Sequence, residues 1–96
     1  MFITVGGPEG RGKSSQLPAL AEFLRQQGHA VSTTREPGGT EIGNQVRAVL
    51  MSLQNTAMNA RTEALLFCAA RAQLVEQVIR PRLAAGEIVL SDRYAD

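Results

Sequence analysis

The stretch from Gly7 to Ser14 limits what this chain can fold into more than any other. It has the sequence G-P-E-G-R-G-K-S, which matches G-x-x-x-x-G-K-[ST], the pattern of a loop whose backbone N–H groups surround a phosphate. An apolar, β-branched run at 1–5 precedes it, and apolar residues at helical spacing over 17–24 follow it. A strand, a glycine turn and a helix N-terminus together form an anion-binding site. The residues expected to bind nucleotide phosphates are Gly7, Pro8, Glu9, Gly10, Arg11, Gly12, Lys13, Ser14 and Ser15.

Three side chains of this loop have specific expected roles. Lys13 should reach the β- and γ-phosphates of a nucleoside triphosphate such as ATP, and the Ser14 hydroxyl should be a ligand of Mg²⁺. Glu9 needs a hydroxyl or a cation as its partner, because a carboxylate close to phosphates is otherwise repelled. The alternative is a glycine-rich turn before an amphipathic helix, which the preceding strand disfavours.

The composition excludes several other classes of protein. A chain of 96 residues with 44% hydrophobic content can form one globular unit, and a net charge of +1 without basic runs gives no reason to expect a nucleic-acid partner. We expect no membrane partner either, since no apolar run approaches the roughly 20 residues of a membrane span. No export signal is visible at the N-terminus, and the single cysteine, Cys68, suits a reducing cytoplasm. We expect Cys68 to be a small core residue.

The periodicity predicts alternating strands and helices in a single domain. The expected elements are a strand at 1–5, a helix at 13–27 that ends before Gly28, a strand at 30–34, a loop at 35–40, helices at 41–53 and 61–85, and a strand at 87–91. This order predicts an α/β fold with a three-layer parallel sheet, with the strands in the spatial order second, third, first.

The helix predicted at 61–85 has one apolar stripe. The stripe consists of Leu65, Cys68, Ala72, Val75 and Ile79, and we expect it to face the core. Pro18 should bend or loosen the first turn of its helix without abolishing the helix, and Pro81 should break or restart the last turn of the long one.

Three segments with chemically functional side chains fall at the carboxyl ends of the strands, where ligands bind in such sheets: the phosphate loop, residues 35–40 and residues 92–94. Asp92 ends an apolar strand and is either a carboxylate beside Mg²⁺ or a turn residue; Arg93 is either a clamp for an acceptor phosphate or a solvated charge. Phe67 and Arg71 lie four apart on one helix face, opposite the apolar stripe. Together they suit a planar base with carbonyl edges, but the pattern alone slightly favours a second packing face with a surface arginine.

These motifs, in this order, resemble the bacterial type of thymidylate (dTMP) kinase. The resemblance rests on the phosphate loop, T-R-E-P-G-G-T at 34–40, F-C-A-A-R-A-Q at 67–73 and S-D-R-Y at 91–94. It implies the P-loop NTPase fold of nucleoside monophosphate kinases, and transfer of the γ-phosphate of ATP to dTMP with Mg²⁺. Lys13 and Ser14 would then serve ATP and metal, Glu9 would meet the deoxyribose 3′-hydroxyl, and Asp92 would assist Mg²⁺ and the acceptor.

The resemblance also implies how dTMP is bound. Phe67 would stack on thymine and Arg71 would hydrogen-bond its edge, while Arg35, Arg47 and Arg93 would surround the dTMP phosphate, with Glu36 in the same site. Arg93 and Arg11 join Lys13 and Asp92 as expected catalytic residues.

The chain departs from the family pattern in three respects. Gly6 replaces the usual glutamate, and Arg11 lies one place after the usual loop arginine, a position that Gly10 fills. The chain also stops two residues after the S-D-R-Y motif, so we expect 1–96 to be the N-terminal part of one P-loop kinase domain, inactive by itself. The full-length protein would be a homodimer. The alternatives are another P-loop nucleoside or small-molecule kinase, or a non-catalytic nucleotide-binding fragment.

Overall fold

Three parallel strands form the centre of the molecule. The computed structural model describes residues 1–5 and 16–93. Its strands are β1 (Phe2–Val5), β2 (Val31–Glu36) and β3 (Ile88–Arg93), in the spatial order β1-β3-β2. Both pairings are parallel, because helices connect each strand to the next. The order predicted from the sequence, second, third, first, is therefore confirmed.

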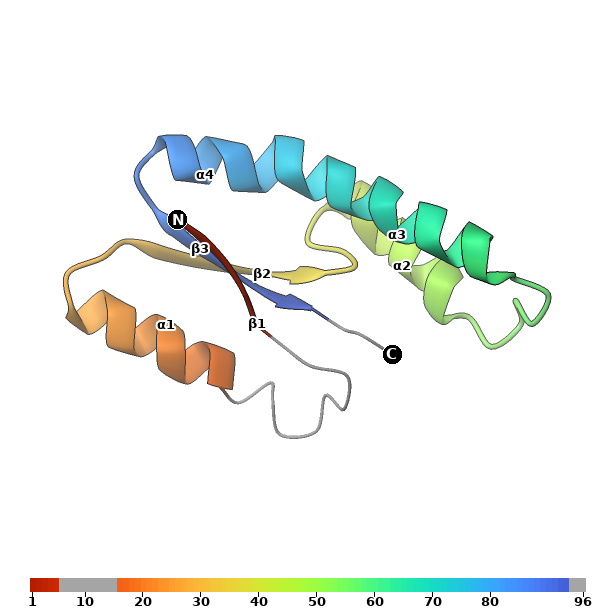
Figure 1. Ribbon diagram of the computed structural model, residues 1–96, viewed down its shortest axis with the longest axis horizontal. Coiled ribbons are helices and arrows are strands. Elements are labelled where there is room, and N and C mark those ends of the chain that lie inside the picture. Colours follow the sequence, from red (N-terminus) through yellow and green to blue (C-terminus); the bar gives the residue numbers. More distant parts are fainter. Residues whose placement is uncertain (6–15, 94–96) are drawn as a thin grey trace.

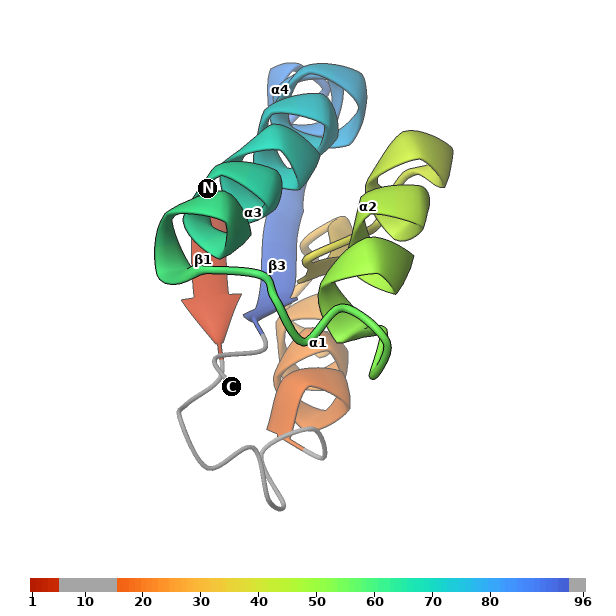
Figure 2. The ribbon, with the colours of Figure 1, turned by 90° about the vertical axis from the view of Figure 1, so that its right-hand side faces the viewer.

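Helices cover both faces of this sheet. The helical elements are α1 (Gln16–Gln26), α2 (Glu41–Met51), α3 (Ala60–Leu74), the π-helical segment η2 (Val75–Ile79) and α4 (Arg80–Ala84). Helix α1 lies on one side of the sheet, and α3, η2 and α4 run as one long rod over the other side (Figure 1). Helix α2 packs beside α3 and away from β1 (Figure 2). In the part of the chain that the structure describes, no helix is both long and apolar enough to cross a membrane.

The central strand β3 contributes to a core on each side. Leu90 packs with Leu17 and Ala21 of α1, whereas its neighbour Val89 packs with Leu74 and Ile79 from the long rod. Successive residues of a strand point to opposite faces, so an uninterrupted apolar run is what a strand buried on both faces requires. The predicted three-layer α/β arrangement is confirmed.

Several predicted boundaries need correction. Strand β2 continues to Glu36 instead of ending at Thr34, because Arg35 and Glu36 pair with Asp92 and Arg93 of a β3 that is also longer than predicted. Helix α2 ends at Met51, two residues early, where Ser52 turns extended. Helix α1 does end before Gly28, whose positive φ closes a Schellman turn with N–H groups of Gly28 and His29 donating back into the helix. The predicted start of that helix at Lys13 lies outside the described residues, and α1 continues past Pro18.

The long rod changes its winding before Pro81. The N–H of Arg80 donates to the carbonyl of Val75, five residues back, and the α-helix then resumes as α4. Pro81 has no N–H to donate to the preceding turn, which gives a physical reason for the irregular winding at this place. The sequence placed the irregularity in the last turn, whereas the π segment begins six residues before Pro81.

The apolar stripe predicted for the long helix is confirmed at Val75 and Ile79, which lie at the core, and is wrong for its first three residues. Leu65 is 64% exposed, and Cys68 and Ala72 are also exposed, whereas the buried side chains of α3 are Ala70 and Leu74. In a regular α-helix Ile79 would lie about 140° around the axis from Leu74. The wider η2 turn instead brings Ile79 into the same core cluster as Leu74. A strict helical period in the sequence cannot show that Leu74 and Ile79 share one face. Cys68 is exposed and is not the core residue that we expected.

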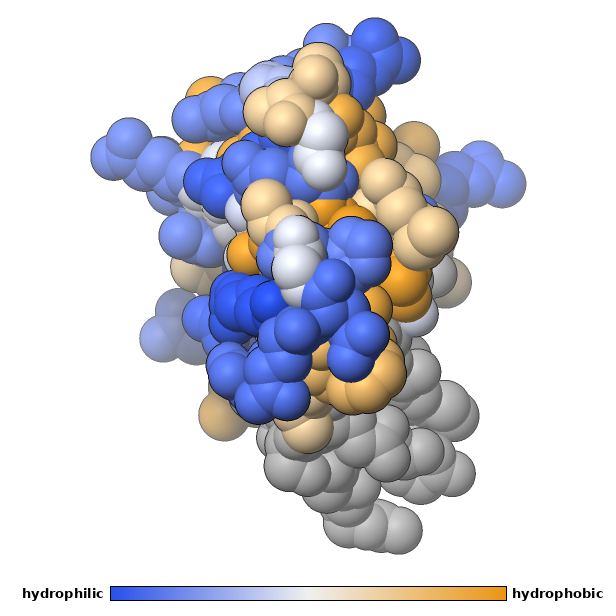
Figure 3. Space-filling view, turned by 90° about the vertical axis from the view of Figure 1, so that its left-hand side faces the viewer, coloured by the Kyte–Doolittle hydropathy of each residue, from blue (hydrophilic) through white to orange (hydrophobic). Residues whose placement is uncertain are grey.

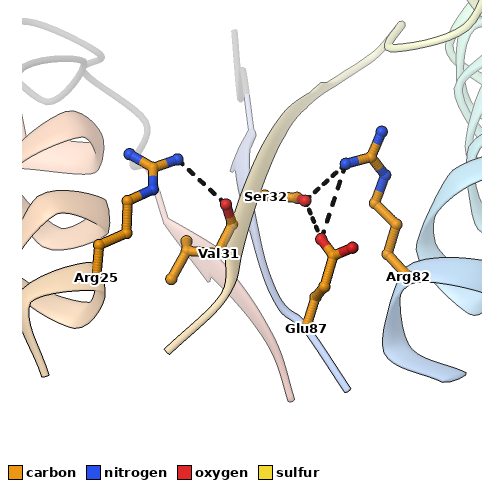
Figure 4. Close-up of polar contacts among 5 residues, drawn as sticks. All are labelled: Arg25, Val31, Ser32, Arg82 and Glu87. Atoms are coloured by element: carbon orange, nitrogen blue, oxygen red, sulfur yellow. Dashed lines mark hydrogen bonds and ion pairs between the residues drawn. The ribbon is translucent and has the colours of Figure 1, made fainter. Parts of the chain in front are cut away.

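Polar side chains join the layers at the amino ends of the strands. Arg25 of α1 donates to the carbonyl of Val31, and on the other side of β2 Arg82 of α4 contacts both Ser32 and Glu87 (Figure 4). Ser32 also hydrogen-bonds Glu87. Hydrophilic residues accordingly gather over the middle of this end of the molecule (Figure 3). The network connects both helical layers to β2, at the end of the sheet opposite the candidate site.

Candidate functional site

The carboxyl ends of the three strands bring the candidate residues to one edge. Val5 of β1, Asp92 of β3 and Arg35 of β2 are neighbours in register across the sheet. Strand β1 ends at this edge with Val5, and the predicted phosphate loop comes after it in the sequence. Parallel strands thus place segments from the start, middle and end of the chain together, as ligand sites of such sheets require.

Within that edge, Arg35 and Glu36 lie on opposite faces. Arg35 shares the face of its partner Asp92 and is exposed, whereas Glu36 shares the face of Ser91 and is 1% exposed. The sequence placed both residues in a loop. Because Arg35 and Glu36 continue the strand instead, their side chains lie on opposite faces of the sheet and have different surroundings.

Glu36 is the centre of a buried polar cluster. The Arg71 Nε lies 2.9 Å from Glu36 Oε1, and Arg71 Nη2 donates to Glu36 Oε2 at 3.3 Å. The hydroxyl of Ser91 donates to the same Oε2 at 3.1 Å. A buried carboxylate is strongly unfavourable unless it is paired and hydrogen-bonded. The cluster therefore fixes α3 to both β2 and β3 through one side chain.

Phe67 lies one helical turn before Arg71. Both side chains are half-buried, and the buried Ala70 and Leu74 lie on the same side of α3. This is the sheet-facing side of the helix, not the side opposite the core as the sequence indicated. The packing reading is supported, because this face lies against the sheet, and the base-binding reading of the pair stays a prediction.

The loop after β2 is tightly packed and positions Arg47. Thr40 caps α2 by accepting from the N–H of Gly43 at 2.9 Å, and Asn44 accepts from the N–H of Gly39 at 3.1 Å. Arg47 donates from Nη1 to the carbonyl of Pro37 at 3.1 Å, which draws this half-buried guanidinium back to the loop. The loop thus holds Arg47 close to the end of β2.

The residues at this edge fit Mg²⁺ by their chemistry. Asp92 is half-buried at the end of the central strand and offers a hard carboxylate oxygen. Among the described residues no three His, Cys, Asp or Glu side chains gather to hold a metal ion. Magnesium needs no such cage, because it is usually held by one or two protein oxygens together with substrate phosphates and water.

Other predicted site residues are not all described. The nine phosphate-loop residues, from Gly7 to Ser15, lie outside the described residues, and Arg93 is described by its backbone alone. The structure brings Glu36 and Arg71 together, and it pairs Arg35 with Asp92 in register. It adds Ser91, which the sequence analysis did not single out. The available signal was a single small polar residue in the otherwise apolar run Ile-Val-Leu-Ser, directly before Asp92.

Comparisons with known proteins agree along the whole chain. The sequence pattern of the thymidylate kinase family matches residues 5–96. A thymidylate kinase of Exiguobacterium sp. is 57% identical over 96 residues, which are all of this chain and 45% of that protein. A thymidylate kinase of Roseiflexus castenholzii is 56% identical over the same length, 42% of its own.

A solved structure matches in three dimensions as well. The crystal structure of thymidylate kinase from Ehrlichia chaffeensis superposes with a TM-score of 0.80 at 37% identity, covering 98% of this chain and 53% of that one. The chain spans less than half the length of the curated relatives described above. The family's sequence pattern matches from the end of the first strand to Asp96, and the fold matches that of a solved thymidylate kinase. The chain therefore belongs to the thymidylate kinase family.

Proposed function

We propose that the protein containing this chain phosphorylates dTMP to dTDP with the γ-phosphate of ATP, a step in dTTP biosynthesis. One observation carries the proposal beyond family membership. Arg71 is held by the buried Glu36 one helical turn from Phe67, at the edge of the sheet where the phosphate loop begins. A flat ring beside a fixed array of N–H donors suits a planar base that has carbonyl edges.

The acceptor dTMP would contact residues from four segments. Phe67 stacks on thymine and Arg71 donates to a carbonyl of its edge, while Glu9 accepts from the 3′-hydroxyl of the deoxyribose. The dTMP phosphate is bound by Arg35, Arg47 and Arg93. Glu36 acts through Arg71, since its own carboxylate is buried and already paired.

The donor ATP would lie on the phosphate loop. Backbone N–H groups of residues 7–15 surround its phosphates, and Lys13 neutralises charge at the β- and γ-phosphates. Ser14 and Asp92 would hold Mg²⁺, which when bound lowers the charge repulsion around the transferred phosphoryl group. Arg11 joins Arg93 as a further cation near that group.

The residues then act mainly by positioning. An oxygen of the dTMP phosphate attacks the γ-phosphorus of ATP in line, the bond from that phosphorus to the β,γ-bridging oxygen breaks, and ADP leaves. Arg35, Arg47 and Arg93 hold the attacking phosphate against its repulsion by ATP. Phe67 and Arg71 fix the base, so that the acceptor is presented in one orientation.

A steady-state assay that couples ADP release to NADH oxidation tests this function. The full-length protein carrying this sequence should turn over dTMP with ATP and Mg²⁺, use dUMP less well and dCMP very poorly. Lys13→Ala should remove nearly all turnover while the protein remains folded, because Lys13 supplies the mobile cation for the β- and γ-phosphates. Equal rates with dTMP and dCMP would favour a different nucleoside or small-molecule kinase, and nucleotide binding without turnover would favour a non-catalytic protein.

The proposal also includes the protein's location in the cell and its association with itself. We place the enzyme in the cytoplasm, where a free, exposed Cys68 is chemically compatible. It acts as a homodimer on small-molecule substrates, with no nucleic-acid or membrane partner. The apolar side chains Ile42, Val49 and Leu65, which are 54%, 44% and 64% exposed on α2 and α3, support an association of this kind. Sedimentation of the full-length protein tests this, and a monomer at micromolar concentration would contradict it.

A further inference from the structure

The ion pair between Arg71 and Glu36 differs from the other ion pairs in burial. Glu36 is 1% exposed and Ser91 is 0% exposed, whereas the Arg71 side chain is 36% exposed. By contrast, the Glu76–Arg80 pair on the same rod is 67% and 70% exposed. Exposed pairs contribute little, and a buried pair costs desolvation energy that an apolar replacement would avoid. The ion pair between the buried carboxylate of Glu36 and the half-exposed guanidinium of Arg71 therefore has a role besides stabilising the fold.

The geometry of the pair determines which donors remain for a ligand. A guanidinium has five N–H donors and no acceptor. Nε of Arg71 lies beside Glu36 Oε1 and one N–H of Nη2 donates to Oε2, which leaves the two Nη1 donors and the second Nη2 donor for a ligand at the carboxyl edge. The Ser91 hydroxyl, on the neighbouring strand β3, donates to Glu36 Oε2 and so restrains the carboxylate. The guanidinium plane is thereby fixed from below by groups of β2 and β3.

We propose that Glu36 and Ser91 are positioning residues that orient Arg71 and thereby set the discrimination between bases. This inference rests on the proposed function. A fixed donor pair matches a carbonyl oxygen at position 4 of a pyrimidine and opposes an amino group there, because both partners would then be donors. A guanidinium that is free to rotate can turn away from the amino group. Loss of either positioning residue therefore weakens selection for dTMP over dCMP more than it weakens binding of ATP.

The test uses three single variants of the full-length protein that carries this sequence. Glu36→Gln keeps the shape of the side chain and removes its charge, and Ser91→Ala removes one hydroxyl. Glu76→Gln is the matched control, because it removes an ion pair from the same rod on its exposed side. The measurements are kcat/KM for dTMP and for dCMP, KM for ATP, and the melting temperature of each variant.

Charge-assisted hydrogen bonds are lost in Glu36→Gln, so the ratio of kcat/KM for dTMP over dCMP should fall about tenfold or more. Ser91→Ala should lower the same ratio less, and Glu76→Gln should leave it unchanged. KM for ATP should stay the same in all three variants. An unchanged ratio in folded Glu36→Gln and Ser91→Ala, or an equal loss with both substrates, would overturn the inference, since a merely structural role lowers both rates together.

A double-mutant cycle tests whether Glu36 acts through Arg71. In an Arg71→Met background, Glu36→Gln should lower the ratio no further, because the group to be oriented is gone. A further drop would overturn the proposed route.

Nuclear magnetic resonance separates this inference from the proposed function. If the wild-type protein fails to phosphorylate dTMP, the proposed function is wrong, but the ¹⁵N-edited signal of the Arg71 guanidinium N–H groups still reports the restraint of that side chain by Glu36. That signal should be sharp and slowly exchanging in the wild type and in Glu76→Gln, and lost or broadened in Glu36→Gln. A signal unaffected by Glu36→Gln would overturn the positioning role whatever the enzyme's substrate.

Discussion

Replacing Gly39 by alanine should destabilise the protein more than the same change at Gly28. Both glycines have positive φ values, +85° at Gly39 and +96° at Gly28. A Cβ at Gly39 would lie 2.5 Å from Thr34 Oγ1 and 2.8 Å from Leu74 Cδ1, whereas nothing lies within 4 Å of a Cβ at Gly28. The two variants thus share the backbone strain and differ in the steric conflict.

The magnitudes follow from these two contributions. A left-handed backbone conformation destabilises the folded state by roughly 1–2 kcal/mol when the residue is not glycine. Alanine also lowers the conformational entropy of the unfolded chain, which offsets about 0.4–1 kcal/mol of that loss. Gly28→Ala should therefore cost about 0–1.6 kcal/mol. Overpacking against Thr34 and Leu74 adds roughly 1–3 kcal/mol, so Gly39→Ala should cost about 1–4.6 kcal/mol, which is more than Gly28→Ala by the overpacking contribution.

Urea unfolding of the two variants and the wild type measures the difference. The midpoint for Gly39→Ala should fall well below that for Gly28→Ala at an unchanged slope, because the native state is affected and the exposed surface is not. Equal losses of unfolding free energy in the two variants would show that the loop after β2 shifts to accommodate the added Cβ without cost. The tight packing of that loop against Thr34 and Leu74, on which the position of Arg47 depends, would then be refuted.

Four further variants test the proposed base contact, the core and the cap of α2. Phe67→Ala should weaken dTMP binding by about 1–3 kcal/mol in calorimetry and leave ATP binding nearly unchanged, and equal weakening of both would mark Phe67 as a packing residue only. Leu74→Ala should lower the free energy of unfolding by about 2–5 kcal/mol, because Leu74 is fully buried. Leu53→Ala, whose side chain is 93% exposed, should have almost no effect on unfolding, and similar losses at the two leucines would contradict the assigned core. Thr40→Ala removes the cap on the N–H of Gly43 and should cost about 0.5–2 kcal/mol in thermal unfolding; an unchanged melting temperature would show that this cap is dispensable.

The order of the elements and the topology of the sheet could be predicted from the sequence, because strands, helices and their glycine ends are coded locally. The side of the long helix that faces the sheet could not be predicted. Its apolar residues fit a helical period through Leu65 and Ile79, but the η2 turn changes the period, and only tertiary packing shows that Leu74 and Ile79 share one face. The sequence therefore placed Phe67 and Arg71 on the wrong side of α3.

The candidate site was predictable to a similar degree. Motifs identify Arg35 and Asp92 as residues of one edge, since parallel strands end together. The pairing of Glu36 with Arg71 and Ser91 joins positions that are far apart in the chain, and it depends on β2 continuing to Glu36. Strand length at this edge is set by pairing with β3, which no local pattern of Arg35 and Glu36 contains.

The proposed enzyme moves the γ-phosphate of ATP onto dTMP. The most direct test is to incubate the full-length protein carrying this sequence with γ-³²P-labelled ATP, Mg²⁺ and dTMP, and to separate the products by chromatography. We expect the label to appear in dTDP, in an amount equal to the ADP formed, and this kind of labelled product to be nearly absent with dCMP as the acceptor. Label that appears only in inorganic phosphate, or that enters dCDP as readily as dTDP, would contradict it.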